Sequence, residues 1–211
     1  MSLHGRIGGK LCDVLVSIAK LKEHQKAGIS LSLSNMLGIT PPTIYGDSAP
    51  YEQPAPRPYG ERSLLYLGHR QPSATAPAEI DPASPREFGY RMPRVIADIV
   101  RARPINLAII DGIETQTSAE GPEPEPGAHR AIHLVKPGIL IAGLNPVCTD
   151  AVAAAAMGCD PLADRGKAPF ETCDSLLRVA EEAGLGARDL GKIEVLGSPI
   201  KAVRFPFRNY V

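Results

Sequence analysis

Two short apolar runs, separated by a polar loop and followed by an alanine-rich stretch, constrain the fold of this chain more than any other feature. The first run spans 107–110 and ends at Asp111 and Gly112, and the second spans 138–143. Apolar runs of this length, bounded by glycine, are typical of strands that are buried on both faces. Because Asn145 is well suited to cap a helix after the second run, the chain predicts strands that alternate with helices, and therefore an α/β fold.

We expect a single α/β domain over residues 13–211, with a mixed or mostly parallel sheet flanked by helices. A strand buried on both faces is predicted at 13–19, where apolar residues occupy both parities, and a last strand at 193–197. Apolar residues at helical spacing predict helices at 30–37, 94–103, 147–157 and 175–183, the first capped by Ser30 and the last by Asp174. The alternation at 29–33 leaves a strand as the alternative to the first of these helices.

Residues 41–93 interrupt this pattern with an irregular, proline-rich insertion. The segment holds eleven of the 21 prolines, and apart from 63–67 no stretch in it keeps a helical or strand period. Loops of this length inside compact domains are either functional covers or disordered segments, and both alternatives remain open for this one.

Charge and cysteine content exclude several classes of protein. Lysine plus arginine and aspartate plus glutamate each total 23, so no global field recruits nucleic acid or an anionic membrane. The four cysteines include no C-x-x-C pair, which argues against a disulfide framework or a cysteine-only metal cluster and predicts buried free thiols. No apolar run approaches the ~18 residues that span a bilayer, so a soluble, cytoplasmic protein is expected. Because the strand at 13–19 follows the start with nothing to cover it, we also expect the native protein to begin earlier.

Acidic residues near the ends of these elements are the main candidates for chemistry. Asp111 ends a strand, and Glu114 follows it closely. Asp150 falls on the apolar face of its helix, where an unpaired carboxylate is costly. Ligands in α/β sheets bind at the carboxyl ends of strands, so these three carboxylates and Glu120 are expected to converge there. In that case Asp111 and Glu114 would bind a divalent metal, and Asp111 and Asp150 would act in acid–base catalysis.

Each of these assignments has a structural alternative. Asp150 would instead accept hydrogen bonds from the backbone amides of the turn at 143–145, and Asp111 would cap its own turn. Residues that follow the first strand would complete a functional site, with His24 as a ligand or proton carrier and Lys22 and Asn35 as cofactor-binding groups. Glu120, in the loop after Asp111, would be a further cofactor-binding group.

Several phrases of the sequence, in this order and spacing, resemble family 362 of the domains of unknown function. They lie at 20–24, 27–38, 106–112, 120–122 and 145–161. Members of that family are sometimes found beside four-iron four-sulfur ferredoxin-type modules, so the resemblance implies an iron–sulfur or redox partner protein, with any cluster outside this chain. The family's activity is not established, and the resemblance therefore does not decide whether this protein is an enzyme.

Two departures from the family pattern affect this expectation. Ser34 stands where the family usually has a lysine, which weakens the case for anion binding there, and members carry a further portion before Val14. The phrase that contains His24 is also distantly similar to the amino-terminal domain of the lactate racemase family.

Two hypotheses follow from the sequence. The first is a metal- or anion-binding site at the carboxyl edge of the sheet, in an enzyme or redox-associated protein. The second is a non-catalytic partner-binding domain that uses the proline-rich segment as its contact surface.

Overall fold

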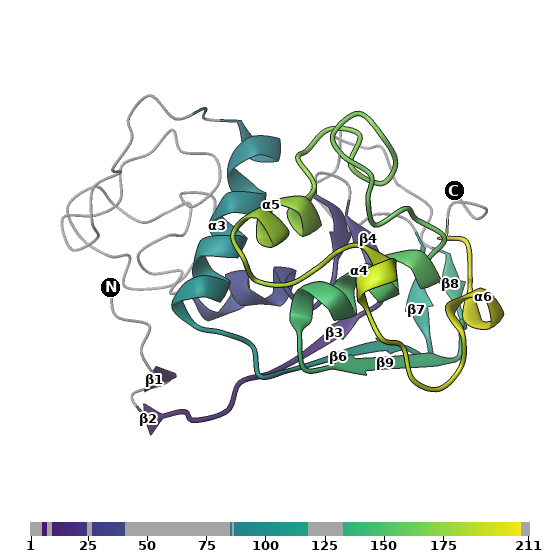
Figure 1. Ribbon diagram of the computed structural model, residues 1–211, viewed down its shortest axis with the longest axis horizontal. Coiled ribbons are helices and arrows are strands. Elements are labelled where there is room, and N and C mark those ends of the chain that lie inside the picture. Colours follow the sequence, from purple (N-terminus) through teal and green to yellow (C-terminus); the bar gives the residue numbers. More distant parts are fainter. Residues whose placement is uncertain are drawn as a thin grey trace.

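The fold is a two-layer α/β arrangement, with a three-stranded sheet in one layer and helices in the other (Figure 1). The computed structural model describes residues 6–7, 10–24, 27–40, 85, 87–117 and 133–207. Most of the proline-rich segment, and Glu120, lie outside these described residues. The predicted α/β class is confirmed.

The sheet has the order β3-β6-β9 and is mixed. Strand β3 (Val16–Lys20) is parallel to the central strand β6 (Leu107–Gly112), and β9 (Ile139–Gly143) is antiparallel to it. The expectation that the first strand is buried on both faces is wrong, because its burial alternates and Val16 and Ile18 are exposed. Burial on both faces requires a second covering layer, and no described helix lies on that side of the sheet (Figure 1).

Helices cover the other face. The covering elements are α3 (Phe88–Ala102), α4 (Pro146–Ala156), α5 (Leu176–Glu182) and the 3-10 helix η1 (Ser34–Ile39). Helix α4 contacts β6 and β9, η1 contacts β3, and α3 packs on η1 and α5. The core between the layers is apolar, with Ile110, Leu177 and Phe170 fully buried. None of the described helices is long and apolar enough to cross a membrane.

The remaining described elements are short. They are the hairpins β1 (Arg6–Ile7) with β2 (Lys10–Leu11), β4 (Lys22–His24) with β5 (Gly28–Ser30), and β7 (Thr115–Gln116) with β8 (Leu134–Val135), the 3-10 helix η2 (Leu190–Lys192), and α6 (Ile200–Val203). The helix predicted at 30–37 is therefore partly wrong, since Ser30 ends a strand and the helical turns begin at Ser34.

Helix α3 begins six residues before the predicted Arg94, so the last residues of the 41–93 segment are helical. Pro93 lies inside the helix, where it cannot donate a hydrogen bond to the carbonyl of Gly89. That carbonyl instead accepts a hydrogen bond of 2.9 Å from the backbone N–H of Asp174. A Cβ atom on Gly89 would lie 2.3 Å from the carbonyl oxygen of Thr172, so only glycine allows this close approach. A tertiary contact thus compensates for the proline.

The two later helices begin with side-chain caps. The Oδ1 atom of Asn145 accepts a hydrogen bond from the N–H of Cys148, as predicted, and the alanine-rich α4 that follows is almost entirely buried. Helix α5 is capped by Ser175, not by the predicted Asp174. Asp174 forms an ion pair with Arg94 at 2.7 Å instead, which joins α5 to α3.

The strand predicted at 193–197 is wrong. These residues are not in strand conformation with any partner among the described residues, and Gly197 has a φ of 91° just before α6 begins. A strand requires a neighbour, and the edge nearest to this segment, that of β9, lies across a groove.

Candidate functional site

Lys20 organises the carboxyl edge of β3 and β6. Its Nζ atom lies 2.6 Å from Oδ2 of Asp111 and donates a hydrogen bond of 2.9 Å to the carbonyl of Glu114. The other carboxylate oxygen of Asp111 accepts from the N–H of Ile113 at 3.0 Å. The hydrogen bond from Lys20, and then that from Ile113, hold the pKa of Asp111 below its ordinary value. Asp111 therefore caps its own turn, the structural alternative, and is also paired with a lysine.

Three lysines surround an open depression of about 470 Å³ at this edge. Lys20, Lys22 and Lys136 line it together with Glu114, whose carboxylate is 2.6 Å from Nζ of Lys136. Lys22 and Glu114 line this depression, and Asp111 lies beside it through its pair with Lys20, so each carboxylate is held by a lysine. The cofactor-binding and catalytic roles expected for Lys22 and Asp111 stay predictions. No group of three or more histidine, cysteine or acidic side chains that could hold a metal ion occurs among the described residues.

Asp150 lies apart from this edge. Because β9 is antiparallel to β6, the carboxyl end of β9 lies beside the amino end of β6. Helix α4, which follows β9, therefore starts at the end of the sheet away from Asp111. The buried carboxylate of Asp150 accepts three hydrogen bonds, at 3.0 Å from the N–H of Ser32, 2.5 Å from the hydroxyl of Ser32 and 3.0 Å from the N–H of Leu33. It satisfies backbone amides, as the structural alternative proposed, but those of the segment after β5 and not those at 143–145.

Burial dominates the ionisation of Asp150. Loss of solvent raises the pKa of this carboxyl to about 7, against the three hydrogen bonds, which favour the charged form. The carboxyl group of Asp150 links α4 to the segment after β5. Its hydrogen-bond partners are Ser32 and Leu33.

His24 and Asn35 have structural contacts outside the carboxyl-edge depression. The Nδ1 atom of His24 accepts a hydrogen bond from the N–H of Ala27 at 3.1 Å, and its ring stacks on Phe88 with 6.5 Å between centroids. The amide nitrogen of Asn35 donates to the carbonyl of Ile18 at 2.9 Å, which fixes η1 to β3. The roles predicted for them and for Glu120 stay predictions.

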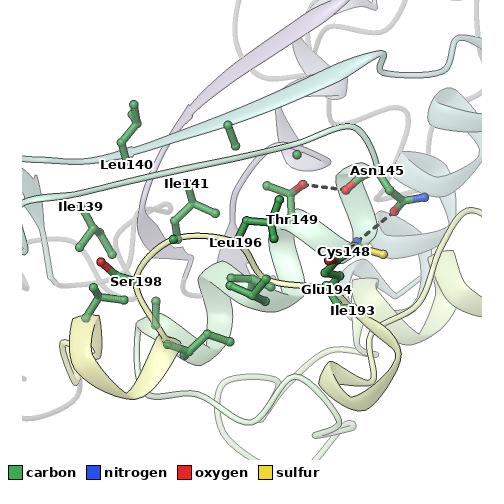
Figure 2. Close-up of a pocket in the computed structure, with 18 of the residues that line it drawn as sticks. Ile139, Leu140, Ile141, Asn145, Cys148, Thr149, Ile193, Glu194, Leu196 and Ser198 are labelled. Carbon is green, nitrogen blue, oxygen red and sulfur yellow. Dashed lines mark hydrogen bonds between the residues drawn. The ribbon is translucent and has the colours of Figure 1, made fainter.

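A groove of about 660 Å³ runs along the free edge of β9 (Figure 2). The strand forms one wall, the first turns of α4 form the floor, and residues 192–198 with part of α6 form the other wall. Figure 2 shows Cys148 and Thr149 extending from the floor between the two walls. Cys148, which the sequence predicted to be a buried thiol, is partly exposed here, and only Cys173 is fully buried.

Both walls of this groove present unpaired backbone. Strand β9 forms a ladder with β6 on one side only, and the backbone of 194–197 forms no hydrogen bond with any part of the chain that the structure describes. The strand predicted at 193–197 coincides with this wall, although the segment forms no strand there. The groove itself could not be predicted, because it depends on the distance between segments some fifty residues apart.

Comparisons with known proteins matched the chain to a protein family. The family model described as Domain of unknown function (DUF362) matches residues 10–155, which include β3, β6, β9 and nearly all of α4. A search of curated proteins and a search of solved structures both found no match.

Proposed function

This chain belongs to the family described as Domain of unknown function (DUF362), and from that premise we propose that it is a non-catalytic partner-binding domain that binds an extended peptide strand in the groove beside β9. The observation that carries the proposal is the free edge of β9 facing residues 194–197 across the groove, whose backbone has no hydrogen-bond partner among the described residues. Exposed strand edges with an adjacent groove bind peptides by strand addition, in which main-chain hydrogen bonds supply affinity and side-chain pockets supply specificity.

The groove defines the chemistry of its ligand. Ile139 and Ile141 point from β9 into it, whereas Leu140 points to the other side of the strand (Figure 2). The floor adds Val152 and Ala156 of α4. Alternate residues of a bound strand would face this apolar surface, and the residues between them would face solvent. The ligand is therefore an extended segment of a partner protein with apolar side chains at every second position. The predicted iron–sulfur or redox partner is one protein that could supply it.

Backbone methylation tests this mode of binding. Peptides would be selected from a random display library on the purified full chain, resynthesised, and methylated at one backbone nitrogen at a time. Each methyl group that removes a ladder hydrogen bond should weaken binding up to about tenfold, measured by calorimetry. If the peptide pairs with β9 alone, positions of one parity should be sensitive. If it also pairs with 194–197, both parities should be.

A pair of matched variants locates the binding site. Leu196 is 83% exposed in the groove wall, and Leu162 is 49% exposed outside the groove. Leu196→Arg should abolish peptide binding, and Leu162→Arg should leave it unchanged, while both keep the thermal stability of the parent. Binding that tolerates methylation at every position, or that survives Leu196→Arg, would rule out strand addition in this groove.

The lysine-lined depression at the carboxyl edge favours a second function, the binding of an anionic small molecule. Lys20, Lys22 and Lys136 carry three positive charges against the two of Asp111 and Glu114. Inorganic phosphate is a suitable probe. Its binding should weaken in Lys136→Ala and with added salt, but not in Lys167→Ala, an exposed lysine elsewhere. Equal phosphate binding by both variants would contradict this candidate. The metal ligation expected for Asp111 and Glu114 stays a prediction.

A further inference from the structure

Two ion pairs at the lysine-lined depression differ in how firmly they are fixed. Lys20 pairs with Asp111 at 2.6 Å and also donates a hydrogen bond of 2.9 Å to the carbonyl of Glu114. The other oxygen of Asp111 accepts from the N–H of Ile113 at 3.0 Å. Lys136 pairs with the carboxylate of Glu114 at 2.6 Å, and neither side chain forms a further hydrogen bond within the described part of the chain. The Lys136–Glu114 pair is therefore the one that a ligand can open.

Glu114 and Lys136 lie on the exposed face of the β7–β8 hairpin. Thr115 of β7 pairs with Val135 of β8, and both are buried. Because side chains alternate along a strand, Glu114 and Lys136, one residue beyond this pair on each strand, face each other on the opposite side. Their side chains are 65% and 74% exposed, respectively. A small ion in the solvent can therefore reach both charged groups.

Positive charge from two lysines converges on the carboxylate of Glu114. The hydrogen bond and charge of Lys136, and then the charge of Lys20, hold the pKa of Glu114 below its ordinary value. The same two ammonium groups would stabilise the negative charge of a ligand at this position. The site therefore contains its own competitor for the ligand.

We infer that Glu114 gates the anion site: a ligand binds by displacing its carboxylate from Lys136, which excludes small monoanions and admits small dianions. The inference rests on the second proposed function, the binding of an anionic small molecule in this depression. Displacement is feasible because an exposed ion pair is weak. The pair of Lys20 with Asp111, which two further hydrogen bonds support, stays in place and keeps its positive end beside the ligand.

The charge of the ligand decides whether it displaces Glu114. A free carboxylate makes the same contact with Lys136 that Glu114 already makes, and it competes with a group that is tethered beside the lysine at high effective concentration. A phosphate dianion carries twice the charge and has three acceptor oxygens, so it interacts more strongly with Lys136 and Lys20 together. The ligand class is therefore that of phosphate and its monoesters, and inorganic phosphate is the simplest member.

Titration of the full chain with inorganic phosphate and, separately, with acetate tests the gate. The amide chemical shifts of residues 114–116 would be followed by NMR at pH 8, where phosphate is a dianion, and at low ionic strength. The parent protein should bind phosphate more tightly than acetate. Glu114→Gln removes the charge and keeps the size of an exposed side chain, so this variant should bind phosphate roughly three- to tenfold more tightly than the parent.

Two further variants show whether the effect belongs to the charge of Glu114. Glu182→Gln is the matched control, because Glu182 is 59% exposed and pairs with Arg178 at 2.8 Å outside the depression, and it should leave phosphate binding unchanged. Glu114→Ala should tighten phosphate binding as Glu114→Gln does, since both variants remove the competing carboxylate.

The outcomes separate the gate from the anion site itself. Phosphate binding that is unchanged or weaker in Glu114→Gln overturns the gate, and the site stands if Lys136→Ala still loses phosphate. Acetate that binds the parent as tightly as phosphate also overturns the gate. Phosphate binding by neither the parent nor Glu114→Gln overturns both the gate and the site.

Discussion

A difference in burial accompanies the opposite pKa shifts of Asp111, at the end of β6, and Asp150, in α4. Asp111 is partly exposed, pairs with Lys20 and caps its own turn, whereas Asp150 is buried beneath the sheet and accepts three hydrogen bonds from Ser32 and Leu33. The pKa of the first is lowered and that of the second is raised to about 7. The same residue type is thus a charged surface group in one place and an interior acceptor in the other.

This difference predicts opposite effects of pH on stability. Asp150 keeps its proton in the folded state up to about pH 7, while the unfolded chain loses it near the ordinary value of 3.8. The folded state therefore binds more protons between these values, so the stability that Asp150 contributes is greatest below pH 3.8 and falls as pH rises toward 7. Asp111 has the opposite sign: its contribution is present above its ordinary pKa and is lost as pH falls through its lowered value.

Urea unfolding of Asp150→Asn over this pH range measures the effect. The variant should lose on the order of 1 to 3 kcal/mol, because one acceptor oxygen becomes an amide that faces a donor N–H. The loss should shrink between pH 4 and pH 7 and be constant above. Asp111→Asn is the control with the reverse trend. A loss for Asp150→Asn that grows with pH would mean that the hydrogen bonds outweigh burial and that the carboxylate is charged.

At the scale of elements, the sequence predicted what local signals encode. The strands β6 and β9 and the helix α4 with its Asn145 cap were expected within a residue or two, since apolar runs, glycines and caps are all local. The start of α3 was missed because a proline usually ends a helix, and here a distant N–H satisfies the carbonyl that Pro93 leaves free.

Strand direction and pairing account for the remaining errors. The convergence of Asp111 with Asp150 assumed that both strands end at the same edge, but nothing local distinguishes the antiparallel β9 from a parallel strand. The segment 193–197 was expected to be a strand but has no neighbouring strand among the described residues, which a local pattern cannot reveal. Asp111 and Glu114 therefore lie near Lys20, where β3 and β6 are parallel, and Asp150 lies apart from them because β9 is antiparallel.

At the scale of the whole molecule, an ion network connects helices that are far apart in the sequence. Asp174 pairs with Arg94 of α3 at 2.7 Å and lies 3.7 Å from Arg178 of α5 and 3.8 Å from Arg165. Arg178 also contacts Asp164 at 3.0 Å. Asp174 therefore joins α3, α5 and the loop between α4 and α5 through its arginine partners. The sequence of either helix alone does not predict these contacts.

Two aspartates of this network differ in burial, and the more exposed one, Asp164, also pairs at 3.2 Å with Arg188, which keeps Glu181 as a second partner. The side chain of Asp174 is 12% exposed and that of Asp164 is 49% exposed, and both contact Arg178. Asp174→Ala should lower the free energy of unfolding by about 1 to 3 kcal/mol, because it leaves partly buried guanidinium groups without their shared partner. Asp164→Ala should cost no more than about 1 kcal/mol, as is usual for exposed ion pairs, and added salt should reduce that cost further. Urea unfolding at low and high salt measures both, and equal losses in the two variants would show that Asp174 does not hold the helices together.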